Sequence, residues 1–593
     1  MNEEIPAPRG LWVALGALTI GAHLALVLWG LVPNLVSRPL HMALVLPWIF
    51  ALPARTPGAR VAAWALTAAG VGACLWIAWN AAALRDQYGF LEGPGQVALA
   101  VLLLALVIEG ARRAIGWPLP LVALAALAYG LLGQHVPGHF GHAGTPLHSF
   151  LGTLTIAEGG IWGSLTGVSA GVVAVFVIFG AILNAGEAGA GFMNLATTLA
   201  GRLRGGAAKV SVLSSALFGS ISGSASANVA STGAVTLPAM LRLGYPPRLA
   251  GAVEAVASSG GQIMPPLMGA GAFVMVELTG IPYPGIMAAA TLPALLYFWA
   301  VWVGIDLEAR RLGIGALPPD ARPARRETAI TATFFAIPFG VLLAGMFAAG
   351  LTPQYAAVLA TGAALALLAF DAEGLALPRL PDRLAAACLA AGRQVAVIGA
   401  IILCASIVVG VLGITGLGVK LTGAILAGAG GTLWGALVLT GLACLLLGME
   451  VPTTAAYVVC VSVAGPALQE LGLAPLQAHL FVFWFALLST ITPPVCGAVF
   501  IAAGMVGESW LKVASTAMRL GLGLYVIPLA MVAHRPIIDL AGAPGRAIVH
   551  GGVVACGLAC LSAALMLRGR GAIPRLAAAA AGAALLFAPA LTG

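Results

Sequence analysis

The sequence predicts an all-α polytopic membrane protein. Of the 593 residues, 61% are hydrophobic and only 8% are charged, and the mean hydropathy is +1.03. Soluble globular chains average about 25% charged residues, so this composition could not shield its apolar side chains from water. Apolar segments of about 20 residues, the length that spans the hydrocarbon layer as a helix, recur along the whole chain. Lipid is therefore the expected solvent, and helices are the expected spanning elements.

The first 150 residues are predicted to form an N-terminal four-helix region. Its spans are 11–33, 40–53, 60–84 and 94–117, and a short apolar run follows at 118–133. Residues 1–10 lack the basic stretch and the small-residue cleavage site of a secretory signal, so the first span is expected to be retained. Two more spans, 547–567 and 576–592, are expected towards the C-terminal end.

Positive charge is spread over short loops. The net charge of +8 is nearly all arginine, which fits the positive-inside rule and argues against a nucleic-acid-binding face. The arginine-rich segment 306–327 is predicted to be a cytoplasmic loop between two halves. The predicted organisation is an N-terminal membrane region at 1–150, a first repeat at 151–305, the loop at 306–327, a second repeat at 328–540 and extra C-terminal helices at 541–593. The eight cysteines lie in apolar stretches without a CxxC pair and are expected to be reduced.

An internal repeat links the two halves. The first half contains Ser222-Gly-Ser-Ala-Ser-Ala-Asn228 and then Ser258-Ser-Gly-Gly-Gln-Ile-Met-Pro-Pro266, and the second contains Gly448-Met-Glu-Val-Pro-Thr-Thr454 and then Ser489-Thr-Ile-Thr-Pro-Pro494. Gly223 matches Gly448 with an offset of 225 residues, and Pro265 matches Pro493 with an offset of 228. In each half, a small, hydroxyl-rich break is followed about 40 residues later by a break that ends in Pro-Pro.

The charges around each unit predict its orientation. Lysine and arginine flank the segment 210–241 on both sides, and its 32 residues are too few for two full spans. It is therefore predicted to be a re-entrant hairpin with its tip at 222–232. The second hairpin, 431–468, lies in a run without Lys or Arg (421–511) and is predicted to open to the other side. The expected fold is an inverted-repeat ion-transporter fold with two re-entrant hairpins and two broken helices, plus the N-terminal four-helix region.

Broken helices predict a binding site. A break inside the bilayer leaves amides and carbonyls that need partners, and such breaks persist where they line a polar cavity. Half-helix N-termini attract anions, and unwound carbonyls coordinate small cations. Four breaks that converge predict one substrate site with ion sites beside it. The candidate binding residues are Ser220, Ser222, Gly223, Ser224, Ser226 and Asn228 at the first tip, Ser259, Gly260, Gly261, Gln262, Pro265 and Pro266 at the first Pro-Pro break, Glu450, Pro452, Thr453 and Thr454 at the second tip, and Thr490, Thr492, Pro493 and Pro494 at the second Pro-Pro break.

Oxygen ligands of this kind suit Na⁺ and not Zn²⁺ or Cu²⁺, which prefer His and Cys. The Na⁺ candidates are Ser220, Ser222, Asn228, Gly260, Thr453, Thr454, Thr490 and Thr492. The competing interpretation is that the small residues only let helices pack closely. It explains one serine-rich patch as well as a binding site does, but it explains four repeated, inverted breaks poorly.

These motifs resemble the large membrane subunit of the TRAP (tripartite ATP-independent periplasmic) transporters, and most closely the fused, TAXI-type permeases. The resemblance covers about residues 150–540, whereas 1–150 resemble the small membrane subunit only in hydropathy and span count. The stretches that carry it are Gly205–Val210, Ser220–Val229, Gly244–Pro247, Ala252–Pro266, Met268–Ala270, Gly448–Tyr457, His479–Phe483 and Thr492–Pro494.

The resemblance implies a permease in the bacterial inner membrane that imports small organic acids, C4-dicarboxylates among them. It implies a scaffold with a mobile transport domain that moves as an elevator, a separate periplasmic TAXI-type binding protein as partner, and symport with Na⁺ or, alternatively, H⁺. No other cofactor, ATPase or nucleic acid is expected, and no G-x-x-x-x-G-K-[ST] phosphate loop occurs. By motif, Ser220, Ser222, Gly223, Asn228 and Gly260 would help form one ion site, and Thr453, Thr454, Thr490, Thr492 and Pro494 its pseudo-symmetric partner.

Three acidic residues need separate interpretations. The family pattern at the second tip is Gly-Met-Gly-hydrophobe-Pro-Thr, and Glu450 replaces its second glycine. We favour a position for Glu450 at the water-exposed mouth of the hairpin over a proton-carrying role. A Glu450→Gln variant with unchanged pH dependence of uptake would exclude the proton-carrying role. Glu254 is expected to pair with Arg248 near the cytoplasmic end, with a direct substrate role as the less favoured alternative, and Glu109 is expected to pair with Arg112 and Arg113.

Other classes of protein fit less well. An intramembrane serine protease would need a G-x-S-G motif with a histidine in a span, and none occurs. A channel usually repeats its broken helices by oligomeric symmetry and not as an inverted pair in one chain. A passive subunit of a respiratory complex would carry charged residues through the midplane. The channel and the passive subunit are kept as alternatives to a transporter, and an enzyme is not expected.

Overall fold

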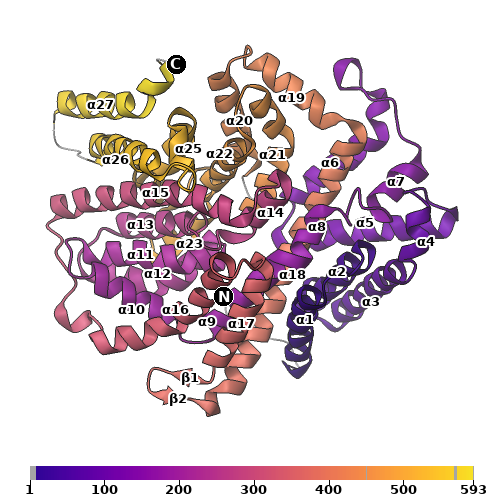
Figure 1. Cartoon of the computed structure of the whole chain (residues 1–593), viewed down its shortest axis with the longest axis horizontal. Helices are drawn as coiled ribbons and strands as arrows, with labels where there is room; N and C mark the ends of the chain where they lie inside the picture. Colours follow the sequence, from indigo (N-terminus) through magenta and orange to yellow (C-terminus); the bar gives the residue numbers. More distant parts are fainter. Residues whose placement is uncertain (1–8, 449–450, 567–570, 592–593) are drawn as a thin grey trace. The chain divides into compact units, whose positions relative to one another are not determined.

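The computed structural model describes residues 9–448, 451–566 and 571–591 (Figure 1). Within these residues it is almost entirely helical, and 10 helices are long and apolar enough to cross a membrane. The strands described are β1 (Phe370–Asp371) and β2 (Gly374–Leu375), which form a short antiparallel hairpin with Phe370 opposite Leu375. The prediction of an all-α polytopic membrane protein is confirmed.

The chain divides into two compact units, each built from several segments. Unit 1 contains residues 1–186, 337–428 and 462–467, and unit 2 contains residues 187–336, 429–461 and 468–593. Two helices, α16 (Arg325–Phe347) and α21 (Thr453–Glu470), contribute residues to both. The boundaries show that sequence order alone does not define the units, since each takes segments from both halves of the chain.

Unit 1 contains the predicted N-terminal spans. Its elements are α1 (Arg9–Trp29), α2 (Asn34–Phe50), α3 (Pro57–Trp79), α4 (Ala81–Asp86), α5 (Gly93–Ile115), α6 (Pro118–Leu132), η1 (Gly133–His135), η2 (Gly138–Phe140), α7 (Leu147–Thr155), α8 (Ser164–Val168), the π-helical turn η3 (Ser169–Val173), α9 (Ala174–Ala185), α17 (Pro353–Leu367), β1, β2, η5 (Leu377–Arg379), α18 (Leu380–Thr415) and α19 (Leu417–Gly428). The predicted N-terminal spans correspond to α1, α2, α3 and α5, and the short apolar run to α6.

The long helix α18 is the centre of unit 1. It packs against α1, α2, α5, α6 and α9. Glycines bring the backbones close: a Cβ on Gly410 would lie 2.6 Å from the carbonyl oxygen of Gly159. Small residues serve this purpose in membranes, where helices associate through packing and not through expulsion of water.

A buried pair of histidines joins α1, α2 and η3. His23 Nε2 lies 2.8 Å from His41 Nδ1, and His41 Nε2 lies 3.0 Å from Ser169 Oγ. The remaining nitrogen, His23 Nδ1, lies 2.7 Å from the carbonyl oxygen of Thr19. All four ring nitrogens have partners, as buried polar groups require, so this network holds the first two helices against the rest of unit 1.

Unit 2 contains the first predicted hairpin, the second up to Val461, and both Pro-Pro breaks. Its elements are α10 (Ala188–Ala200), α11 (Gly206–Ser222), α12 (Ala225–Arg242), α13 (Pro247–Gly261), α14 (Gly269–Thr279), α15 (Tyr283–Leu312), η4 (Pro319–Ala321), α20 (Leu433–Leu447), α22 (Pro475–Leu487), η6 (Leu488–Thr490), α23 (Gly497–Val506), α24 (Trp510–Leu520), α25 (Gly523–Ala533), η7 (Arg535–Ile538), α26 (Pro544–Met566) and α27 (Ala572–Leu591). The last two correspond to the predicted C-terminal spans, 547–567 and 576–592.

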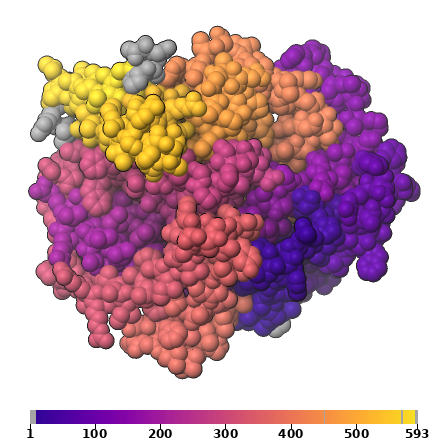
Figure 2. All heavy atoms as spheres, in the orientation of Figure 1, coloured from indigo at the N-terminus to yellow at the C-terminus, as the bar shows by residue number. Residues whose placement is uncertain are grey.

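The C-terminal helices α26 and α27, yellow in Figure 2, form part of the surface of unit 2. They pack on each other, and α26 also packs on α15. Ile548, Val549 and Ile573 leave more than half of their surface exposed. Contiguous exposed apolar side chains on a spanning helix are expected where lipid is the solvent.

The repeat extends further than the motifs indicate. The second arms of the hairpins begin at Ala225 and Thr453, the next helices at Pro247 and Pro475, and the helices after the Pro-Pro breaks at Gly269 and Gly497. In each pair the numbers differ by 228. Gly223 and Gly448 differ by 225 and not by 228, because they lie at the hairpin tips, which differ in length. Two residues separate the arms of the first hairpin, and five separate the arms of the second.

Candidate functional site

The first hairpin consists of α11 and α12, which pack against each other and against α13 (Figure 1). Its turn is Gly223–Ser224, where Gly223 has a φ of +61°, which favours glycine. Ser224 Oγ then caps α12 by accepting from the backbone N–H of Ala227 at 3.3 Å. The tip is therefore shorter than the predicted 222–232, and Asn228 and Thr232 lie inside α12.

The hairpin tip lies against the first Pro-Pro break, which has a cis bond between Pro265 and Pro266. A Cβ on Gly223 would lie 2.8 Å from the Cα of Gly269, which begins α14. Contact this close between backbones is possible only because both residues are glycines. The structure thus brings together the first tip and the first Pro-Pro break, as the sequence predicts.

Asn228 fastens the hairpin to the end of α13. Its side chain is fully buried, and its Nδ2 donates to the carbonyl oxygen of Ser215 at 2.9 Å and to that of Ser258 at 3.5 Å. Gly219 and Gly261 make this approach possible, because a Cβ on Gly219 would lie 2.5 Å from the Cα of Gly261. The predicted site residues Asn228 and Gly261 therefore lie in contact.

The serines of the first tip differ in their bonding. Ser220 Oγ donates to the carbonyl of Leu217 at 2.7 Å. Ser222 Oγ is buried and has no hydrogen-bond partner among the described residues. Buried hydroxyls are usually bonded, so a hydroxyl left free at a hairpin tip is available to a ligand. Ser226 lies close to the second half of the repeat, because a Cβ on Gly497 would lie 3.4 Å from its Oγ.

The two Pro-Pro breaks meet through their hydroxyls. Thr490 Oγ1 lies 2.8 Å from Ser259 Oγ and 2.7 Å from the carbonyl of Leu487. The second break, which also has a cis bond between its prolines, places Thr492 Oγ1 2.6 Å from the hydroxyl of Tyr525 on α25. Tyr525 carried no sequence signal. Residues 231 apart in the chain thus lie side by side within unit 2.

The remaining candidates lie at the first Pro-Pro break or at the second hairpin. Gly260 is packed against the ring of Tyr297, and Gln262, 5% exposed, follows the end of α13. Pro452, Thr453 and Thr454 are half-buried around the first turn of α21, and among the described residues the side-chain hydrogen bonds of Ser259 and Thr490 go to other groups. Glu450 lies outside the described residues.

The prediction that Glu254 pairs with Arg248 is wrong. Glu254 is fully buried on α13, and hydroxyl groups surround its carboxylate. These belong to Ser211 and Ser215 on α11, Thr232 and Thr236 on α12, and Ser258 on α13. Three pairs spaced by four residues could have revealed the arrangement, because i and i+4 share a helix face: Ser211 and Ser215, Thr232 and Thr236, and Glu254 and Ser258.

Arg248 instead lies near Glu508, in the loop before α24. The pKa of the Glu508 carboxyl lies below its usual range, mainly because the backbone N–H of Ser509 and the ammonium of Lys512 bond to it, with a smaller contribution from the charge of Arg248. The charge of Arg248 therefore acts on Glu508 and not on Glu254.

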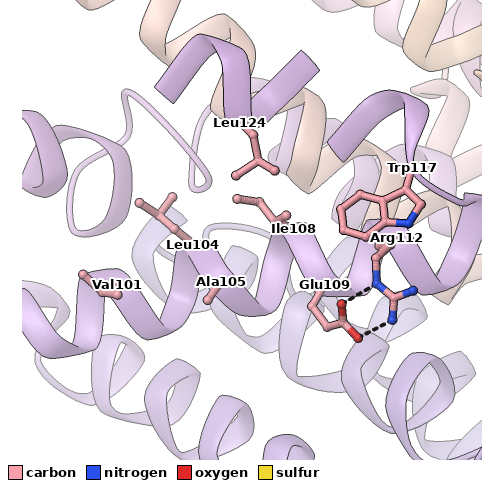
Figure 3. A pocket seen from close by; sticks show the side chains of 8 residues that line it. All are labelled: Val101, Leu104, Ala105, Ile108, Glu109, Arg112, Trp117 and Leu124. Carbon is pink, nitrogen blue, oxygen red and sulfur yellow. Dashed lines mark hydrogen bonds and ion pairs between the residues drawn. The ribbon is translucent and has the colours of Figure 1, made fainter. Parts of the chain in front are cut away.

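A separate pocket of about 370 Å³ occurs in unit 1 (Figure 3). It is lined by Val101, Leu104, Ala105, Ile108, Glu109, Arg112, Trp117 and Leu124. The predicted ion pair is confirmed: Arg112 Nε lies 2.6 Å and Arg113 Nε 2.7 Å from the carboxylate oxygens of Glu109. None of the predicted binding residues lines this pocket.

The helical fold is that of a multi-pass membrane protein. Comparison with known families agrees: the family described as "Tripartite ATP-independent periplasmic transporter, DctM component" matches residues 101–544. The chain belongs to this family, the large permeases of TRAP transporters. Its members are transport components and not enzymes, and they are found in bacterial inner membranes.

Individual relatives are distant but match more than half of the chain. The YgiK protein of Salmonella typhimurium is 25% identical over 391 residues, 63% of this chain and 85% of the relative. The C4-dicarboxylate TRAP transporter large permease protein DctM of Pseudomonas aeruginosa is 24% identical over 366 residues, 62% of this chain and 84% of the relative. The isethionate TRAP transporter permease protein DctMQ of Oleidesulfovibrio alaskensis is 24% identical over 372 residues, 62% of this chain and 56% of the relative.

Proposed function

We propose that this chain is the membrane permease of a secondary transporter that imports small organic acids, receives them from a TAXI-type periplasmic binding protein, and uses a Na⁺ gradient, with H⁺ as the alternative coupling ion. The observation that carries the proposal is the meeting of the two Pro-Pro breaks, where Thr490 Oγ1 lies 2.8 Å from Ser259 Oγ. Interrupted helices from both halves of an inverted repeat form the substrate site in many secondary transporters.

The polar groups at these breaks support an ion site. Serine and threonine hydroxyls, the Asn228 amide and unwound carbonyls are hard oxygen ligands, which suit Na⁺. The free Ser222 hydroxyl is one such group. Among the described residues no cluster of three or more His, Cys, Asp or Glu could hold a metal, so the oxygen-rich breaks are the best candidates for the coupling ion. The second ion site would use Thr453, Thr454, Thr490 and Thr492.

The division into units supports an elevator mechanism. Unit 2 contains the first hairpin, the second hairpin up to Val461, and both Pro-Pro breaks. We propose that the part of unit 2 built from these elements is the moving transport domain, and that unit 1 supplies the scaffold. Rigid-body movement of the domain that holds the site would expose the site to the two sides of the membrane in turn, without the site itself being rebuilt.

The N-terminal region, residues 1–150, would then act as a fused small subunit, followed by the first repeat (151–305), the connecting segment (306–327), the second repeat (328–540) and the extra helices (541–593). Because α15 ends at Leu312 and α16 begins at Arg325, the connection between these helices is shorter than the predicted loop. The name DctMQ of one relative supports a fusion. The buried contacts of His23 and His41 support firm attachment of α1 and α2 within unit 1.

Small anions are the expected substrates. The names of relatives mention C4-dicarboxylate, isethionate and sialic acid, all of which carry an acidic group. Half-helix N-termini such as those of α12, α14, α21 and α23 would attract such a group. Selectivity would be shared with the binding protein, so a panel of acids is the appropriate probe.

Uptake in proteoliposomes tests the proposal. The full chain is reconstituted with a TAXI-type binding protein outside, and uptake of labelled carboxylic and sulfonic acids is measured with an inward Na⁺ gradient, with a pH gradient and with neither. Uptake that needs both the binding protein and one ion gradient supports the proposal and identifies the ion. Flux without a binding protein or gradient would contradict it and favour a channel.

A further inference from the structure

The Glu254 carboxylate and its five surrounding hydroxyls form a buried acidic site in unit 2, which we name the Glu254 ring. Its members are Ser211, Ser215, Thr232, Thr236 and Ser258 together with Glu254. Glu254 is 0% exposed. An ionised carboxylate in such surroundings is costly unless a positive charge accompanies it.

Among the described residues, the Lys and Arg side chains of the helices that form the ring have other partners. On α11, Lys209 binds Asp306 at 2.8 Å. On α12, Arg242 Nε donates to the carbonyl of Pro238 at 3.3 Å, at the far end of the helix. Arg248, at the start of α13, acts on Glu508. The cationic side chains of α11, α12 and α13 therefore interact with groups other than the Glu254 ring.

The charged side chains of the other helices packed against α13 also have partners outside the ring. On α15, Arg310 and Arg311 bind Asp306 and Glu308, at 2.7 and 2.5 Å, and the hydroxyl of Tyr297 donates to the carbonyl of Val256 at 2.7 Å. The charged residues of α24 point to other groups: Lys512 binds Glu508 at 3.1 Å, and Arg519 Nε donates to the carbonyl of Ser515. The sequence of α23 has no titratable residue. Among the described residues, no ion pair includes Glu254.

The hydroxyls of the ring can serve a protonated acid as well as an ionised one. Thr232 Oγ1 contacts both Glu254 Oε1 and the carbonyl of Asn228, the latter at 2.8 Å. Thr236 Oγ1 likewise contacts Glu254 Oε2 and the carbonyl of Thr232, the latter at 3.0 Å. Each hydroxyl has one hydrogen for two acceptors. A proton on one oxygen of Glu254 would supply one of the two missing hydrogens, because the threonine at that oxygen could then accept from the acid and donate to its own helix.

We propose that Glu254 is a proton-binding site of this protein, which takes up one solvent proton on a carboxylate oxygen and releases it through the surrounding hydroxyls. Uptake forms one O–H bond, release breaks it, and no other covalent bond changes. The ring continues towards the hairpin tip through Thr232, whose Oγ1 lies 3.4 Å from Asn228 Oδ1. Protonation of Glu254 therefore alters the hydrogen bonding of Asn228, one of the residues proposed to bind the coupling ion.

The link to coupling rests on the proposed transport function, whereas the protonation itself does not. The test is therefore made without substrate. Infrared difference spectra of the purified full-length chain in lipid are recorded between low and high pH, in sodium chloride and in choline chloride, and the C=O stretch of a protonated carboxyl group is followed.

The matched variants are Glu254→Gln and Glu308→Gln. Glu308 is also buried, at 8% exposure, but it is paired with Arg311. We expect a protonated-carboxyl band that titrates with pH, is lost in Glu254→Gln and persists in Glu308→Gln. The absence of such a band in the wild-type protein, or its persistence in Glu254→Gln, would overturn the proposal; a band lost instead in Glu450→Gln would place the proton at the second hairpin.

A second pair of variants covers the case in which Glu254→Gln does not fold. Thr236→Val removes one donor to the ionised carboxylate and should move the midpoint of the band to higher pH, because hydroxyl donors favour the charged form. Thr291→Val should leave the midpoint unchanged, because Thr291 lies on α15, is more exposed than Thr236, and its hydroxyl bonds only its own helix. An unchanged midpoint in Thr236→Val would contradict the assignment to Glu254.

Discussion

Thr490 Oγ1 lies 2.8 Å from Ser259 Oγ, so a hydroxyl of the second Pro-Pro break meets one of the first. Ser259 Oγ itself donates to the carbonyl of Ala255 at 2.8 Å, so its lone pairs can accept from Thr490, whose single hydrogen is shared between Ser259 Oγ and the carbonyl of Leu487. The bond ties together two interrupted helices that belong to different halves of the repeat. A ligand bound between the two breaks would depend on this hydrogen bond.

Thr490→Val should weaken binding of the coupling ion. Valine has nearly the same shape but lacks the hydroxyl, and one hydrogen bond contributes about 1 kcal/mol, or about fivefold in a binding constant. The ion concentration for half-maximal uptake in proteoliposomes should therefore rise by about fivefold or more. Thr291→Val is the control, and an equal effect in both variants would contradict a specific role for Thr490.

Gly219→Ala should lower the thermal stability of the purified protein. Its Cβ would lie 2.5 Å from the Cα of Gly261, and two backbones cannot yield as a flexible side chain can. Overpacking of this kind costs about 1–3 kcal/mol. The control is Gly552→Ala in α26, where a Cβ meets nothing within 4 Å and alanine is the better helix former. Thermal unfolding in one detergent compares them, and equal melting temperatures would be evidence against the tight contact.

Gly223→Ala should open the first hairpin tip. Two costs combine there: a φ of +61°, and a Cβ 2.8 Å from the Cα of Gly269. Gly280→Ala separates them, since Gly280 has a φ of +68° but open space around it. The backbone strain alone costs about 1–3 kcal/mol. We expect Gly223→Ala to lose more uptake and more thermal stability than Gly280→Ala, and equal losses would show that the contact with Gly269 is unimportant.

Asn228→Asp should damage the site more than its small change in shape implies. Aspartate cannot donate to the carbonyls of Ser215 and Ser258, and an unpaired buried polar group costs about 1–3 kcal/mol, more when it is charged. Asn184→Asp is the control, because Asn184 is exposed on α9. Uptake and melting temperature should both fall in Asn228→Asp and stay near wild type in Asn184→Asp. A stable Asn228→Asp protein with normal uptake would refute the role of the amide as a donor.

The sequence by itself determined the class of the protein and the position of its breaks. Hydropathy is a local property, so spans such as α1, α3 and α5 can be recognised one at a time. The Pro-Pro pairs and the glycine-rich tips end helices for reasons that lie within a few residues, and their repetition indicated that Ser259 and Thr490 occupy related places.

Only the tertiary structure decided which of these groups meet. The pairing of Glu254 with hydroxyls from α11 and α12, and not with the nearer Arg248, depends on how three helices pack, which spacing along one helix cannot specify. The same is true of Gly219 and Gly261, whose contact brings Asn228 within reach of α13. The division into two units also crosses the order of the chain. Packing in a membrane is decided by the fit of surfaces from distant segments, and hydropathy carries no information about that fit.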